Sequence, residues 1–86
     1  MNTATQQRVI FRKWKSNGDV IAFFLDCPET PGHCLSYAHV GQHGTAAYPH
    51  PQTDSAEPWE YEPLLKELVT CGYDNLRVVS KGRIKS

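Results

Sequence analysis

Two histidines, a glutamine and a tyrosine gather between residues 37 and 44 of the chain. Imidazole and carboxamide groups both donate and accept hydrogen bonds, so this segment has the chemistry of a recognition site. Two glycines in the same run would let the backbone approach a partner closely. The candidate binding residues are Tyr37, His39, Gly41, Gln42, His43, Gly44 and Tyr48.

A metal site is one alternative for this run, because His39 and His43 are spaced four residues apart. That spacing brings two histidines together on a helix, but Gly41 between them argues against a helix here. Zinc sites also show closely paired ligands, and the chain has no Cys-x-x-Cys pair. We therefore expect no metal and no cofactor, with the histidines serving as hydrogen-bonding residues.

Nucleophilic catalysis is a further alternative, through Cys34 or Ser36. Neighbours on a strand point to opposite faces, so His33 is badly placed to activate Cys34, which we expect to be a small buried hydrophobe. No glycine-flanked elbow surrounds Ser36. We predict that the protein is not an enzyme, and a small hydrolase centred on His39 and His43 stays the enzymatic alternative.

Nucleic-acid binding is the main alternative function. Basic and aromatic residues on the first and last predicted strands would form one strip if those strands are adjacent, as single-stranded nucleic acid requires. Basic residues on edge strands also prevent aggregation, which is the simpler explanation. The residues of this alternative are Arg12, Lys13, Trp14, Arg77, Lys81 and Arg83.

Aromatic residues near the start of a predicted helix suit a protein-binding surface. Trp59 and Tyr61 lie there, and Tyr48 precedes them. We expect Tyr61 to pack in the core and Trp59 to be partly exposed. A protein partner is therefore favoured over nucleic acid.

Local sequence patterns predict the strands and the helix on which these residues lie. Strands are predicted at 8–15, 20–25, 33–40 and 76–80, and Asn17-Gly18 indicates a hairpin between the first two. A loop without periodicity runs to about residue 55, where Asp54 or Ser55 would cap a helix. The sequence predicts an α+β fold: one antiparallel sheet of about four strands with one helix on one face, in the order β-β-β-α-β.

The helix prediction depends on apolar residues at helical spacing. Pro58 suits a first helical position, Pro63 would kink the helix or begin it, and Gly72 would end it. The apolar residues are Tyr61, Leu64, Leu65, Leu68 and Val69.

Length and composition limit the remaining possibilities. The chain has 86 residues, for which we expect one domain over 8–86 after a disordered tail at 1–7. Nine basic and nine acidic residues give zero formal charge, which disfavours strong nucleic-acid binding and permits a homo-oligomer. Three cysteines and the lack of a signal peptide predict a cytoplasmic protein. The longest apolar run, at 20–25, is too short for a membrane span.

Three segments, at 9–13, 36–44 and 72–79, together resemble a family of small uncharacterised bacterial proteins common on phages, plasmids and conjugative elements. The run Ser-Tyr-Ala-His-Val-Gly-Gln-His-Gly at 36–44 is the most specific part. The resemblance implies that the protein belongs to a mobile genetic element, and it implies no known activity. The sequence thus predicts a small non-enzymatic binding or accessory protein that uses the end of the third strand and the following loop.

Overall fold

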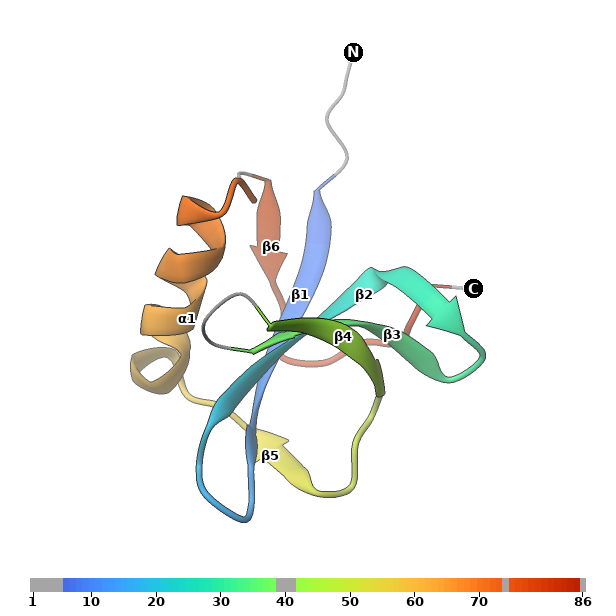
Figure 1. The fold of residues 1–86 in the computed structure, drawn as a ribbon, viewed down its shortest axis with the longest axis horizontal. Helices are drawn as coiled ribbons and strands as arrows, with labels where there is room; N and C mark the ends of the chain where they lie inside the picture. Colours follow the sequence, from blue (N-terminus) through green and yellow to red (C-terminus); the bar gives the residue numbers. More distant parts are fainter. Residues whose placement is uncertain (1–5, 39–41, 74, 86) are drawn as a thin grey trace.

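The computed structural model describes residues 6–38, 42–73 and 75–85, in which six strands form one sheet and one helix packs on it (Figure 1). The predicted α+β class is therefore confirmed. The elements are β1 (Gln7–Trp14), β2 (Val20–Thr30), β3 (His33–Ala38), β4 (Gln42–Ala47), β5 (Thr53–Ser55), α1 (Pro58–Thr70) and β6 (Leu76–Val78).

The hairpin of β1 and β2 confirms the Asn-Gly prediction. The strands pair antiparallel from Val9 opposite Phe24 to Lys13 opposite Val20. Gly18 has φ 77°, a left-handed conformation that glycine adopts without a steric penalty. β1 begins at Gln7, the last residue of the predicted tail, and the Gln7 N–H donates to the Asn75 carbonyl at 3.0 Å. Residues 1–5 of that tail lie outside the described residues.

The predicted count of about four strands was wrong, because the segment expected to be a loop contains β4 and β5. β4 pairs antiparallel with β3 from Ala38 opposite Gln42 to His33 opposite Ala47. Small and polar residues give β4 no apolar alternation, and β5 has three residues, too few to show a period. Pairing with neighbouring strands, which sequence periodicity does not report, holds both in place.

The order of strands across the sheet is β4-β3-β2-β1-β5, with β6 also pairing with β1. β5 and β6 thus share one edge of β1: β5 is antiparallel to residues 12–14, and β6 is parallel to residues 7–9. The order therefore differs from the prediction, and the sheet includes one parallel pair. The first and last strands are adjacent, which is the condition that the nucleic-acid alternative required.

Both faces of the sheet are apolar, because the inner strands alternate between two cores. We call the face under α1 the helix face and the opposite one the far face. The helix face holds Val9, Phe11, Val20, Ala22, Phe24, Tyr37, Leu64 and Leu68. The far face holds Ile10, Ile21, Phe23, Leu25 and Cys34.

Helix α1 starts at Pro58 after an N-cap at Glu57, so the predicted cap at Asp54 or Ser55 was wrong. Glu57 and Glu60 form a capping box in which the Glu57 N–H donates to Glu60 Oε1 at 2.8 Å. Pro63 lies inside the helix, which neither starts nor stops there. Gly72, at φ 111°, follows the helix as predicted, and the next N–H, of Tyr73, donates back to the Leu68 carbonyl at 3.1 Å.

Candidate functional site

The residues proposed for binding are divided between the two faces of the sheet. Tyr37 on β3 stands opposite His43 on β4, and both side chains lie on the helix face. Tyr48 packs on Phe23 on the far face, with ring centroids 5.3 Å apart. Gly44 is exposed, and Gln42 joins β4 through its backbone pairing. His39 and Gly41 lie outside the described residues.

Tyr37 is fully buried, so its side chain supports the surface from beneath and is not presented to a partner. Its hydroxyl donates to the carboxylate of Glu67 and lies 3.6 Å from the Cys71 sulfur. Glu67 and Cys71 are four residues apart at the end of α1, where this spacing puts both on one side of the helix. The buried hydroxyl thus joins β3 to the last turn of α1.

His43 is exposed, and its position on β4 is fixed by contacts to the segment after α1. Its Nε2 lies 3.0 Å from the Tyr73 hydroxyl, and its ring packs on the Tyr37 ring in a T-shaped arrangement with centroids 4.7 Å apart. Tyr73 stacks on Phe24 at 5.0 Å, and burial raises the pKa of the Tyr73 hydroxyl. The tyrosine therefore stays neutral near pH 7 and keeps its hydrogen-bonding capacity.

We call these five residues the histidine corner: Tyr37, His43, Glu67, Cys71 and Tyr73. Sequence reasoning missed the last three as site residues. The sequence could have indicated Glu67 and Cys71, because they lie beside the predicted apolar stripe of Leu64 and Leu68 at the end of the same helix.

The described residues give evidence on the metal site and on the two nucleophiles considered above, Ser36 and Cys34. Within residues 6–38, 42–73 and 75–85, no three His, Cys, Asp or Glu side chains form a group that would hold a metal ion. Ser36 pairs with Gly44 and is buried on the far face, whereas His43 lies on the helix face, so Ser36 and His43 form no catalytic pair. Burial raises the pKa of the Cys34 thiol to about 11, which keeps it protonated at neutral pH.

The basic residues of β1 do not form one strip, since alternate side chains go to opposite faces. Lys13 lies on the helix face, where its Nζ is 2.8 Å from Glu60 Oε2. That hydrogen bond lowers the pKa of Glu60. Arg12 and Trp14 lie on the far face. The remaining basic residues of the alternative, Arg77, Lys81 and Arg83, are exposed.

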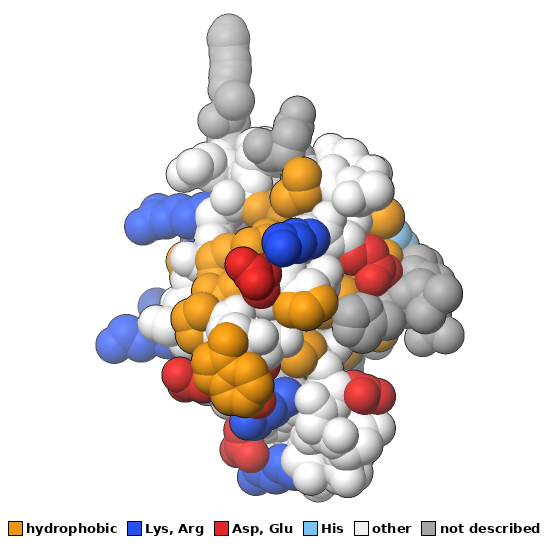
Figure 2. Space-filling view, turned by 90° about the vertical axis from the view of Figure 1, so that its left-hand side faces the viewer, with side chains coloured by type: hydrophobic (Ala, Val, Ile, Leu, Met, Phe, Trp, Pro, Cys, Tyr) orange, Lys and Arg blue, Asp and Glu red, His pale blue; other side chains and the backbone are white. Residues whose placement is uncertain are grey.

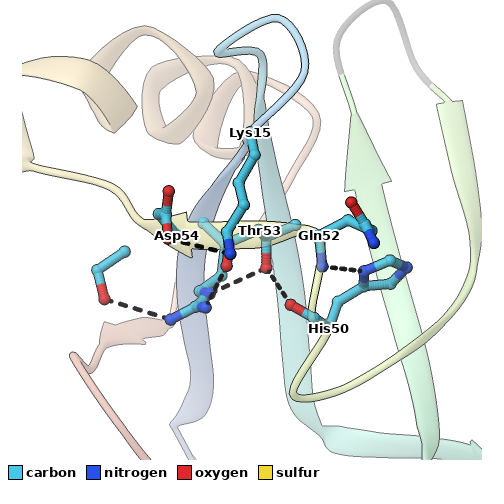
Figure 3. A network of polar contacts seen from close by, with 7 residues as sticks. Lys15, His50, Gln52, Thr53 and Asp54 are labelled. Carbon is cyan, nitrogen blue, oxygen red and sulfur yellow. Dashed lines mark hydrogen bonds and ion pairs between the residues drawn. The ribbon is translucent and has the colours of Figure 1, made fainter.

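A polar network around Thr53 and His50 fastens β5 to β1 (Figure 3), and Arg12 takes part in it. Its Nε donates to Thr53 Oγ1 at 3.1 Å, its Nη2 to the Thr53 carbonyl at 2.7 Å, and its Nη1 to Ser55 Oγ at 3.2 Å. Thr53 Oγ1 in turn donates to the His50 carbonyl at 2.8 Å. The His50 ring meets Trp14 edge-on at 4.8 Å. Each of the three guanidinium nitrogens of Arg12 therefore donates a hydrogen bond within the fold.

A groove of about 370 Å³ lies where α1 begins, between the ends of β5 and β6. Phe11 and Tyr61 line it and stack on each other with centroids 4.5 Å apart, and Val78 and Pro58 add apolar surface. The predicted packing of Tyr61 against the core is thus confirmed.

Trp59 lies next to this groove in the chain and is 76% exposed, more than the partial exposure predicted. Figure 2 shows hydrophobic side chains gathered on the side of the molecule that carries α1. Trp59 follows the groove residue Pro58 in the chain, and we call the groove and this exposed tryptophan together the Trp59 groove.

Comparisons with models of protein families, with curated proteins and with solved structures find no match to this chain. The resemblance to phage and plasmid proteins therefore stays a prediction. Within the described residues, no helix combines the length and the apolar character that a membrane span needs.

Proposed function

We propose that the protein is a small non-enzymatic binding domain that receives an apolar segment of a protein partner in the Trp59 groove. Two observations carry the proposal: an apolar groove of about 370 Å³, and a tryptophan that is 76% exposed and follows the groove residue Pro58 in the chain. An exposed indole contributes little to folding, whereas tryptophan is enriched among the residues that dominate binding energy. An accessory role in a phage or plasmid setting rests on the resemblance alone.

The charges around the groove suggest the kind of segment that fits. Glu57 lines the groove, and Glu62 and Asp54 are exposed near the same end of α1. Carboxylates at the rim favour a partner with basic residues beside its apolar anchor, and they disfavour phosphate. The proposed ligand is therefore a peptide segment with one bulky apolar side chain flanked by lysine or arginine.

The histidine corner supplies a second, polar surface for the same partner. His43 and Cys71 are exposed there, and the hydrogen bond to Tyr73 holds His43 in one place. A side chain already ordered in the free protein loses less entropy on binding. Of the binding residues predicted from the sequence, this surface includes His43, with Tyr37 buried beneath it.

Affinity capture from a lysate of the source cells tests the proposal. We expect Trp59→Ala to reduce recovery of the bound protein at least about tenfold, the effect of losing a dominant interface residue. Val69→Ala is the matched control, because it truncates another exposed apolar residue of α1, near the end of the helix that lies away from the groove. Equal recovery by wild type and Trp59→Ala would disprove the role of the groove, and His43→Ala tests the histidine corner in the same way.

Single-stranded nucleic acid is the second candidate, favoured by one observation. The pairing of β6 with β1 sets Arg77 beside Arg8, and the exposed Lys81 and Arg83 follow on the same segment. We expect any such binding to weaken steeply with salt and to be reduced by Arg77→Ala. A lack of oligonucleotide binding at low salt would remove this candidate.

A further inference from the structure

The outer edge of β4 is unprotected against pairing with another strand. β4 is the last strand in the sheet order, so no strand of the described chain pairs with its outer side. It contains neither a charged residue nor a proline, and its pairing with β3 has no register shift. Exposed edges usually carry charges, prolines or bulges that prevent such pairing.

The strands at the other end of the sheet differ from β4 in length and in charge. β5 and β6 have three residues each, half the length of β4. β5 carries Asp54, and β6 carries Arg77. These short, charged strands have the features that discourage edge pairing, and β4 does not.

The hydrogen bonds of the β3–β4 hairpin show which backbone groups point outward. The Tyr48 N–H donates to the Gly32 carbonyl at 3.1 Å, one step beyond the pair of Ala47 and His33. Backbone groups alternate in direction along a strand, so those of Ala47 point away from β3. The same alternation puts the N–H and C=O of Thr45 and His43 on the outer edge.

We propose that this edge binds a second copy of the same chain, with two β4 strands antiparallel about a two-fold axis at Thr45. Thr45 then faces the partner's Thr45, and His43 faces the partner's Ala47. In this register every outward-pointing residue of one strand faces an outward-pointing residue of the other. Each facing pair exchanges two backbone hydrogen bonds, and the two sheets become one continuous sheet.

The chemistry of the edge favours a second copy over a different partner. A two-fold interface places each residue against its own patch, so any charge on β4 would meet a like charge nearby. β4 has no such charge, and the whole chain has zero formal charge, which removes repulsion between copies. Thr45 is β-branched and suits a cross-strand pair with itself.

Sedimentation velocity over about a hundredfold range of concentration tests the assembly, since mass action shifts a dimer with concentration. We expect the mass to rise from one chain to two. Thr45→Lys should keep the chain monomeric, because the two introduced ammonium groups would face each other. Thr70→Lys is the control, since it makes the same change at another exposed position, at the end of α1.

Amide hydrogen exchange identifies the edge directly. Raising the concentration should slow exchange at His43, Thr45 and Ala47 and leave Gly44 and Ala46 unchanged. Thr45→Pro removes an outward N–H, so it should abolish this change while the circular dichroism spectrum stays that of the wild type.

A chain that is monomeric at every concentration would overturn the proposal, and so would a dimer that survives both Thr45 substitutions. Trp59→Ala should leave the dimer unchanged, so this result stands apart from the test of the Trp59 groove.

Discussion

The two faces of the sheet are closed in different ways. On the helix face, Leu64 and Leu68 insert from a regular helix, and the Lys13–Glu60 ion pair and the Tyr37–Glu67 hydrogen bond join helix to sheet. On the far face the cover is irregular chain, with Tyr48, Val79 and Ile84 packed on the core. The same alternating strands supply both cores. A small sheet that is apolar on both sides needs two covers, and here one of them has no periodic structure.

The irregular cover is held mainly by polar contacts to the sheet. The Lys85 N–H donates to the Leu25 carbonyl at 2.7 Å, and Arg8 Nη2 donates to the Arg83 carbonyl at 3.1 Å. Arg8 is itself held by Asp26 at 2.9 Å, which lowers the pKa of Asp26. We therefore expect the far face to open more easily than the helix face, because few apolar contacts hold its cover.

Truncation of a buried side chain on the helix face should cause the largest loss of stability. Leu68 is fully buried under α1, and Leu68→Ala should lower the free energy of unfolding by about 2–5 kcal/mol through lost burial and a cavity. Urea denaturation measures the change. Val69→Ala, at the next position and 53% exposed, should change the free energy by less than about 0.5 kcal/mol. Similar losses for both would mean that the helix does not close this core.

Truncation of a side chain in the cover of the far face should lower the free energy of unfolding by less. Ile84 is half-buried, and Ile84→Ala should lower the free energy of unfolding by about 1 kcal/mol. Exchange of the Lys85 amide should quicken more than that of amides in β1 or β2. A loss as large as that of Leu68→Ala would show that the two faces are closed equally firmly, contrary to the comparison.

A further effect, confined to alkaline pH, is a loss of stability from the far face. The pKa of Cys34 is raised from 9.0 to about 11 in the folded chain, chiefly by burial. The folded state then holds a proton that the unfolded state releases, so this contribution is complete below about pH 9 and is lost as the pH rises to about 11.

Denaturation at several pH values measures this slope. Cys34→Ala should flatten it, though not completely, because the pKa values of Tyr48 and Tyr73 are also raised by burial. An unchanged slope in Cys34→Ala would contradict the burial of its thiol.

Sequence reasoning predicted the elements that carry a local signal. Asn17-Gly18 indicated the first hairpin, and the spacing of Leu64 and Leu68 indicated the helix and its buried stripe. β4 was missed because residues such as Gly44 and Ala46 carry no apolar alternation, and its position depends on pairing with β3.

The candidate site was predicted only in part, for a related reason. Tyr37 and His43 were singled out from one run, and they do lie together. Their partners Glu67 and Tyr73 come from a distant segment, and no local pattern reports which distant side chains a fold brings into contact. Tyr48 belongs to the opposite face because side chains alternate along an extended chain, and an odd number of positions separates it from His43.

The sharing of one edge of β1 by β5 and β6 has a consequence for how the chain folds. β1 and β2 are neighbours in sequence and pair through a tight turn, so they form early and at little entropic cost. The strands that complete the other edge of β1 lie beyond β4 and beyond α1. Until both have arrived, an apolar hairpin presents an open edge, and this interval is when newly made chains are most prone to aggregate.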